Sequence, residues 1–133
     1  MFPEYRIIAL DKVKETIKNM VIEINSFLST VMLEELENAL KKEESETGKE
    51  ILSQIIQNFK LARDKKMPYC QDTGTCVVFL EVGERVKFDK EGLLDYVNQG
   101  VAEGYEEGYL RKSIVEDPLE KRVNTKTNTP AVV

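Results

Sequence analysis

A polar corner near the middle of the chain holds the residues best suited to chemistry. The segment Cys70–Thr73 places a thiol, an amide, a carboxylate and a hydroxyl in a row, with Pro68 before it and Gly74 after it. A proline restricts the residue before it and a glycine permits unusual backbone angles, so the four groups are expected on a fixed turn. The corner lies between a helical pattern and a strand pattern, where such a turn would expose its side chains.

Three interpretations of Cys70 follow from its position: an incidental or structural thiol, a nucleophile or redox thiol, and a metal ligand. A thiol nucleophile usually needs a nearby histidine as its base, and the sequence contains no histidine. A redox pair usually has a two-residue spacer, whereas five residues separate Cys70 from Cys76. Zinc needs four ligands, which this sequence cannot assemble alone. Spacing alone therefore favours the incidental thiol about as much as the other interpretations together, and a bound metal would need ligands from outside this chain.

The neighbours of Cys70 and a distant arginine also have plain structural interpretations. Asp72 precedes a threonine and a glycine, which fits an Asx-type turn whose carboxylate accepts local backbone N–H groups. Arg111, taken alone, is typical of a surface ion pair. Gln71 carries no signal of its own.

Composition limits the classes of protein that the chain can represent. Its 133 residues fit one domain, and the net charge of -5 argues against nucleic acid as the main partner. No apolar run approaches the roughly 20 residues that span a bilayer, and the N-terminus lacks the apolar core of a signal peptide. We therefore expect a cytoplasmic protein with no membrane partner and with reduced cysteines. Without histidine, acid–base chemistry would depend on carboxylates, hydroxyls or a metal.

Hydrophobic spacing predicts three helices before the corner. Apolar residues recur every three or four positions over Leu10–Leu28 and Met32–Leu40, and Ser29-Thr30 between them is a predicted cap. A third helix is predicted from Thr47, which has capping-box spacing to Glu50, until Pro68 stops it.

The spacing of the apolar residues changes after the corner. Thr75–Val82 is short and β-branched and predicts a buried strand, in which Cys76 is a small buried hydrophobe. Gly83-Glu84 would turn this strand into a hairpin whose return strand contains Val86 and Phe88. Asp89 is then expected to cap a fourth helix that runs to about Tyr109.

The fourth predicted helix carries a glycine at every fourth position, at Gly100, Gly104 and Gly108. Each glycine costs about 1 kcal/mol against alanine, which is tolerable where this face approaches another backbone closely. The chain beyond Leu110 has the composition of a loop. Its last residues, Ala131–Val133, begin a strand-like run, from which we expect a truncated chain.

These patterns predict an α+β fold that is predominantly helical, with about four helices and a small β-sheet or hairpin after the Cys70 turn. Residues 1–67 form a helical lead-in. Residues 68–133 contain the turn, the strands, a helix and a loop.

The corner also resembles a known signature. The run Cys70–Thr75 followed by Val77–Phe79 is similar to the N-terminal region of class I, iron–sulfur fumarases and of their relatives, the L(+)-tartrate dehydratases. Further similar segments occur in the same order in this family: Lys42–Ser45, Gly48–Ile51, Gly108–Ser113, Asp117–Leu119 and Asn128–Val132. The resemblance covers nearly the whole chain and identifies it as the N-terminal part of an alpha subunit.

The resemblance implies a hydro-lyase that adds or removes water on a four-carbon dicarboxylate, either fumarate/malate or L-tartrate/oxaloacetate. In the family a 4Fe-4S cluster is held by three cysteines, and its remaining iron acts as a Lewis acid on the substrate. Cys70 matches the first cluster ligand. Gln71 and Asp72 match substrate-binding residues, with Asp72 also catalytic at the hydroxyl that leaves, and Arg111 matches the arginine that grips a carboxylate.

The resemblance also implies what this chain lacks. The other two cysteines and the proton-abstracting residue would lie in a C-terminal domain or a beta subunit, and we expect a homo- or hetero-oligomer. This chain alone is expected to hold no stable cluster and to be inactive. Roles for Asn128 and Thr129, and the choice between fumarate and tartrate, stay open at this stage.

Two rival functions belong to other classes. A non-catalytic helical interaction module would use the corner as a mere turn and would bind a protein partner through its apolar faces. A thiol redox protein would form a titratable disulfide between Cys70 and Cys76.

Overall fold

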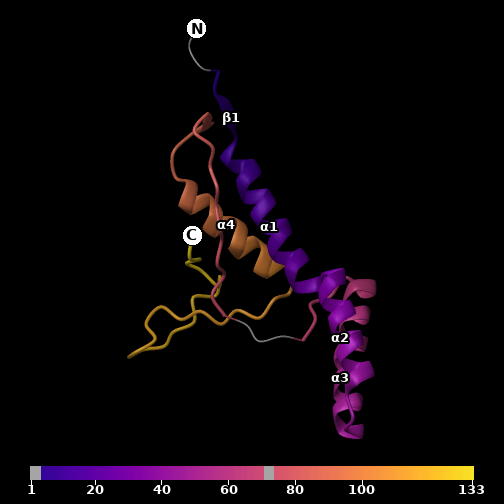
Figure 1. The fold of residues 1–133 in the computed structure, drawn as a ribbon. Coiled ribbons are helices and arrows are strands. Elements are labelled where there is room, and N and C mark those ends of the chain that lie inside the picture. The colour runs from indigo at the N-terminus through magenta and orange to yellow at the C-terminus, as the bar shows by residue number, and fades with distance from the viewer. Residues whose placement is uncertain (1–3, 71–73) are drawn as a thin grey trace. The chain divides into compact units, whose positions relative to one another are not determined.

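The computed structural model describes residues 4–70 and 74–133 of the chain (Figure 1). The chain divides into two compact units. Unit 1 consists of Met1–Ile22 and Asp72–Val133, and unit 2 consists of Glu23–Gln71. Helices dominate both units and strands are few, so the predicted α+β class is confirmed in its broad form. In the described ranges, no helix combines the length and apolar character that a membrane span requires.

Unit 1 is built on the packing of α1 (Leu10–Ser26) against α4 (Leu93–Glu107). A Cβ atom added at Gly100 would lie 2.5 Å from the Lys14 carbonyl oxygen, and one at Gly104 would lie 3.0 Å from the Lys18 oxygen. The glycine face of α4 therefore meets the backbone of α1, as the glycine spacing predicts. Ion pairs from Lys14 to Glu103 at 3.0 Å and from Lys18 to Glu107 at 3.3 Å join the same two helices.

The core of unit 1 lies between these helices and the chain that follows them. Its buried members are Ile17, Val21, Val101, Tyr105 and Leu110. Partly buried apolar residues pack against them from α1, from the segment after the corner and from the end of the chain: Val13, Cys76, Val78 and Ala131. Isoleucine, valine and tyrosine side chains placed at helical spacing thus supply the hydrophobic contact that holds α1 to α4.

The sheet consists of two short parallel strands, β1 (Arg6–Ile8) and β2 (Val86–Phe88), with Arg6 opposite Val86 and Ile8 opposite Phe88. This pairing carries Asp89 to the start of α1, where its Oδ1 accepts a hydrogen bond of 2.9 Å from the Leu10 N–H. The prediction that Asp89 caps α4 is therefore wrong. The cap residue of α4 is Gly92, with φ of 93°.

Of the strands predicted after the corner, the one that contains Val86 and Phe88 is confirmed as β2, whereas the strand over Thr75–Val82 and the hairpin pairing are wrong. Residues 75–82 form no strand, and the Phe79 side chain is 95% exposed. The β-type pairing of this segment is limited to one isolated parallel bridge between Val77 and Val132. Gly83 lacks the positive φ that a type II′ hairpin turn requires at its first central position, and β2 pairs with β1 instead. A segment with high β-propensity becomes a strand only where another backbone offers hydrogen bonds along its length.

Unit 2 is a pair of packed helices, α2 (Thr30–Lys42) and α3 (Glu46–Lys65). The predicted cap before α2 is confirmed, because Ser29 Oγ accepts from the Met32 N–H at 3.3 Å. The cap of α3 is Ser45 and not the predicted Thr47, since Ser45 Oγ accepts from the Gly48 N–H at 3.3 Å. Both caps satisfy N–H groups that have no partner inside the helix.

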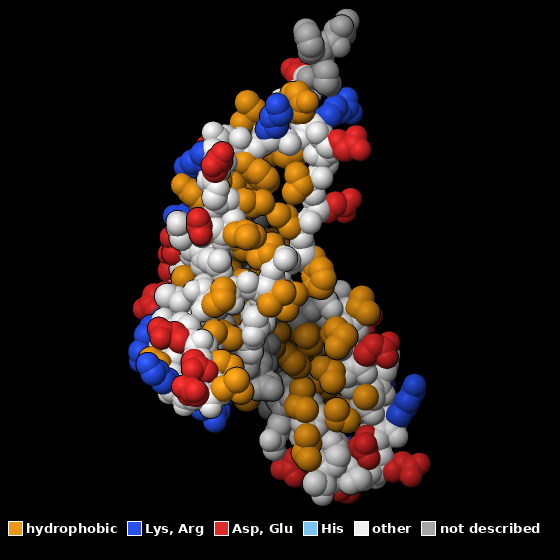
Figure 2. All heavy atoms as spheres, turned by 90° about the vertical axis from the view of Figure 1, so that its left-hand side faces the viewer, with side chains coloured by type: hydrophobic (Ala, Val, Ile, Leu, Met, Phe, Trp, Pro, Cys, Tyr) orange, Lys and Arg blue, Asp and Glu red, His pale blue; other side chains and the backbone are white. Residues whose placement is uncertain are grey.

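The apolar side chains of unit 2 are only partly covered. In α3, Ile56 and Ala62 are buried, whereas α2 buries no residue. Large apolar side chains are exposed along the pair, and Figure 2 shows hydrophobic atoms gathered at its surface. They include Val31, Met32, Ile51, Ile55 and Leu61.

Candidate functional site

Cys70 lies just after α3, with its side chain exposed. Its backbone N–H donates a 2.9 Å hydrogen bond to Oδ1 of Asn58, a residue of α3. The backbone of Cys70 is thereby tied to a helix while its thiol stays accessible. Such a combination suits a thiol that must bind something outside its own unit.

Tyr69, the residue directly before Cys70, makes three contacts within unit 2. Its backbone N–H donates to the Asn25 carbonyl at 3.0 Å, and its hydroxyl donates to the Ile24 carbonyl at 2.7 Å. Its ring meets the ring of Phe59 edge-on, with centroids 4.7 Å apart. Partial burial raises the pKa of the Tyr69 hydroxyl, so this group stays protonated and remains a donor. The predicted fixed turn therefore has a physical basis on its N-terminal side.

Gln71 and Asp72 lie outside the described residues, so their proposed substrate contacts remain predictions. The description resumes at Gly74 in unit 1. A Cβ atom added at Gly74 would have no atom within 4 Å.

Arg111 belongs to unit 1 and is exposed, directly after the buried Leu110. Among residues 4–70 and 74–133, Arg111 takes part in no ion pair, whereas its neighbour Lys112 pairs with Glu106. An exposed guanidinium without a carboxylate partner in these ranges is suited to bind an external carboxylate. Cys70, in contrast, belongs to unit 2.

Two residues that restrain the backbone at Cys70 carry no clear signal in the sequence, and Asn128 is marked there only as part of the similar segment Asn128–Val132. Asn58 is one polar residue on an ordinary amphipathic helix, and Tyr69 stands out only because it adjoins Cys70. Asn128, within a loop-like run, is fully buried and accepts and donates hydrogen bonds through its side-chain amide. The buried position of Asn128 could be found only from the structure.

The two cysteines differ in exposure, which a metal ligand requires: Cys70 is exposed and Cys76 is not. Cys76 is half-buried against the core of unit 1, and this burial raises the pKa of its thiol, which disfavours the thiolate that a metal needs. No group of three potential metal ligands among His, Cys, Asp and Glu occurs within the described part of the chain. The described residues therefore fit one ligand of a cluster, Cys70, and do not fit a complete site.

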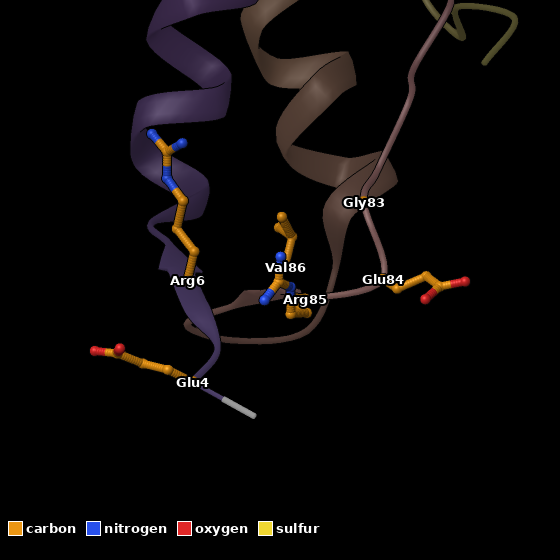
Figure 3. A pocket seen from close by; sticks show the side chains of 6 residues that line it. All are labelled: Glu4, Arg6, Gly83, Glu84, Arg85 and Val86. Carbon is orange, nitrogen blue, oxygen red and sulfur yellow. The ribbon is translucent and has the colours of Figure 1, made fainter. Parts of the chain in front are cut away.

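A cavity of about 560 Å³ lies elsewhere in unit 1, between the start of the chain and the loop before β2. Its lining consists of Glu4, Arg6, Gly83, Glu84, Arg85 and Val86 (Figure 3). Figure 3 shows Glu4 and Glu84 pointing in opposite directions, and the lining balances two acidic against two basic side chains. Neither Cys70 nor Arg111, the predicted site residues that the structure describes, lines this cavity, and its charges do not converge on a ligand.

Comparison with known proteins agrees with the motif at the corner. The family model for fumarate hydratase (Fumerase) matches residues 14–133, a range that includes Cys70 and Arg111. A Methanocaldococcus jannaschii protein provisionally named L(+)-tartrate dehydratase subunit alpha is 36% identical over 118 residues, which are 88% of this chain and 41% of the relative. The L(+)-tartrate dehydratase subunit alpha of Escherichia coli strain K12 is 31% identical over 121 residues, which are 91% of this chain and 39% of the relative. This chain thus spans about two fifths of the length of these relatives. It belongs to the fumarate hydratase (Fumerase) family.

Proposed function

We propose that this chain is part of an iron–sulfur hydro-lyase that adds or removes water on a four-carbon dicarboxylate, either fumarate/malate or L-tartrate/oxaloacetate. One observation carries the proposal: the family match extends over residues 14–133 and so includes both the exposed Cys70 and Arg111. The names of the relatives refer to L(+)-tartrate dehydratase subunits, and the family name refers to fumarate hydratase. Either substrate is compatible with the residues of this chain.

Each proposed site residue has a task that follows from its chemistry. Cys70 would be one of three thiolate ligands of a 4Fe-4S cluster, and the other two would come from outside this chain. The bound cluster would supply Lewis acidity toward the substrate hydroxyl. Arg111 would hold a substrate carboxylate through its planar guanidinium, and Gln71 would donate a hydrogen bond to a carboxylate. Asp72 would be catalytic, because its carboxyl group would exchange the proton at the hydroxyl that leaves or orient that group.

The geometry around Cys70 supports its part in this proposal. A ligand must hold its position when the metal is absent, because a mobile ligand loses conformational entropy on binding. Asn58 and the three contacts of Tyr69 restrict the backbone at Cys70, and the exposed thiol is open to partners outside unit 2. Cys76 lacks this exposure, so it is not proposed as a ligand.

We further propose that unit 2 contacts the rest of the enzyme, either a beta subunit or a C-terminal domain. Soluble proteins rarely leave a large continuous apolar surface uncovered. The pair α2 and α3 exposes large apolar side chains, with Val31 66% and Leu61 55% exposed. The names of the relatives describe them as alpha subunits, which supports a partner of this kind.

Replacement of Cys70 by serine in the complete enzyme that contains this chain tests the cluster role. The variant is expected to lose the broad visible absorption of the cluster and nearly all hydratase or dehydratase activity, with the far-UV circular dichroism unchanged. The matched control is Cys76→Ala, which removes the half-buried thiol and is expected to keep both cluster and activity. A Cys70→Ser enzyme with full cluster absorption would contradict the assignment. A non-catalytic interaction module, in contrast, would bind its partner unchanged and would contain no cluster in any variant.

The isolated chain offers a second test of the missing ligands. Anaerobic reconstitution of the purified 133-residue chain with iron and sulfide is expected to give no stoichiometric cluster, because the chain offers one suitable thiol. A brown protein with about four irons and four sulfides per chain would show that this chain assembles a complete site, against the proposal.

A further inference from the structure

Asn128 connects three segments of unit 1 through one buried amide. Its side chain is 0% exposed, and its backbone adopts φ of 58°. Oδ1 accepts hydrogen bonds from the N–H groups of Ser113 at 2.6 Å and Ile114 at 3.1 Å. Nδ2 donates a hydrogen bond of 3.1 Å to the Gly74 carbonyl, 54 residues away in sequence. Removing this amide would cost about 1 kcal/mol for each ordinary hydrogen bond that is lost.

The Oδ1 side of this connection restrains the segment that contains Arg111. On one side of Arg111, Leu110 is buried and its N–H donates to the Tyr105 carbonyl at 3.0 Å. On the other side, Asn128 holds the N–H groups of Ser113 and Ile114. The Arg111 backbone is therefore tied at both flanks, while its side chain is exposed.

A second asparagine strengthens the same segment. Nδ2 of Asn124 donates to the Lys112 carbonyl at 2.9 Å, and the Thr125 N–H donates to the Ile114 carbonyl at 2.9 Å. These bonds do not reach Gly74. The hydrogen bond to the Gly74 carbonyl comes from Asn128.

The Nδ2 side of the connection holds Gly74, two residues after Asp72 in sequence. Gly74 is exposed, and a Cβ atom added at this position would meet open space. The hydrogen bond from Asn128 is a directional contact that can place Gly74.

We propose that Asn128 is a positioning residue. It fixes the position of Gly74, at the end of the polar corner, relative to the segment that contains Arg111. The inference rests on the proposed function, in which Asp72 and Arg111 act on one dicarboxylate. The amide is suited to this task because it accepts at one end and donates at the other. Ionised aspartate would keep the acceptor and lose the donor, whereas glycine would fit the positive φ and offer neither.

The two variants distinguish the hydrogen bonds of Oδ1 from the hydrogen bond of Nδ2. The measurements are made on the chain itself and need no enzyme activity. Asn128→Gly is expected to speed hydrogen exchange of the Ser113 and Ile114 amides by about fivefold or more, which corresponds to the loss of one ordinary hydrogen bond. Asn128→Asp is expected to leave both exchange rates within about twofold of wild type. Both variants should shift the carbonyl carbon resonance of Gly74, because it loses its donor.

Kinetics of the complete enzyme then test whether the geometry matters for the reaction. In Asn128→Asp the arginine segment stays tied, so KM for the dicarboxylate is expected within about twofold of wild type, while kcat falls by about tenfold to a hundredfold. In Asn128→Gly the hydrogen bonds of both Oδ1 and Nδ2 are lost, so KM should rise by about fivefold or more in addition. The aspartate variant keeps the test informative if the glycine variant does not fold.

A matched control removes a comparable hydrogen bond elsewhere in unit 1. Asn98 on α4 accepts from the Ala131 N–H at 2.8 Å through its own Oδ1. Asn98→Ala is expected to lower stability but to leave kcat and KM within about twofold of wild type. If Asn128→Asp matched this control in kcat, KM and the Gly74 resonance, Asn128 would be merely structural and the inference would be overturned. A wild-type enzyme without hydro-lyase activity would overturn the proposed function instead, while exchange and resonance would still show whether Asn128 holds both segments.

Discussion

Replacing Gly100 by alanine would force apart the two helices that form the core of unit 1. The added Cβ atom would lie 2.5 Å from the Lys14 carbonyl oxygen and 3.0 Å from Ile17 Cβ. Because the Lys14 oxygen belongs to the backbone of α1, no side-chain rotation can relieve this contact. One helix must shift, which loosens the packing of Ile17 and Val101 between them.

The magnitude follows from two opposing effects. Overpacking of a well-packed core costs about 1–3 kcal/mol, and a clash with helix backbone belongs near the upper end, at about 3 kcal/mol. Alanine in place of glycine within a helix stabilises the helix by about 1 kcal/mol. The free energy of unfolding should therefore fall by about 2 kcal/mol. Gly104→Ala should cost less, because its Cβ atom would lie 3.0 Å from the Lys18 oxygen, a contact that a smaller shift relieves.

Urea denaturation followed by far-UV circular dichroism measures this loss. The matched control is Gly48→Ala in α3, where the added Cβ atom would meet the Glu43 side chain, 2.6 Å from its Cδ atom. That side chain can rotate away with the loss of its hydrogen bond from the Ser45 N–H, about 1 kcal/mol, which offsets the gain of about 1 kcal/mol in helix propensity. The control should therefore stay within about 0.5 kcal/mol of wild type. A Gly100→Ala variant as stable as wild type, or stabilised by the gain in helix propensity, would refute the close packing of α1 on α4.

Other perturbations address single contacts. Asp89→Ala removes the acceptor for the Leu10 N–H and should lower the free energy of unfolding by about 1 kcal/mol in the same urea assay, with no loss if the cap is unimportant. Tyr69→Phe keeps the ring and deletes one hydrogen bond, so a loss of about 1 kcal/mol is expected, and a neutral result would contradict its anchoring role. In thiol labelling at pH 8, Cys70 should react first because it is exposed, whereas burial raises the pKa of the Cys76 thiol and lowers its thiolate fraction. Equal rates, followed by mass spectrometry of labelled peptides, would argue against this difference.

The helices and the position of the chemistry could be predicted from sequence because their signals are local. Apolar spacing of three and four residues locates α1, α2 and α3, and Ser29 is recognised as a cap by its type and place. The four-residue glycine spacing predicts the close helix contact that Gly100 makes. The polar corner is recognised from consecutive residues, and the family of the chain follows from the same run.

The spacing predicts the strand that contains Val86 and Phe88, which is β2, but the pairing of this strand could not be predicted in this way. The run 75–82 has strong β-propensity, yet β-propensity records the fit to a neighbouring strand, and the described residues offer it one bridge. The true strand pair joins Arg6–Ile8 to Val86–Phe88, segments separated by most of the chain. A single sequence contains no local signal for such a pairing, since its hydrogen bonds come from backbone groups common to all residues.

The sequence by itself therefore determined the helical segments, the glycine face and the residue types at the corner, because each depends on neighbours within a few positions. Tertiary structure alone decided which distant groups those residues meet. Asp89 accepts from the start of α1 and not from α4, and Asn128 holds Gly74 and Ser113 together. The physical reason is that a carboxylate or an amide can satisfy any suitable partner, and only the packing of the chain brings one partner within hydrogen-bond distance.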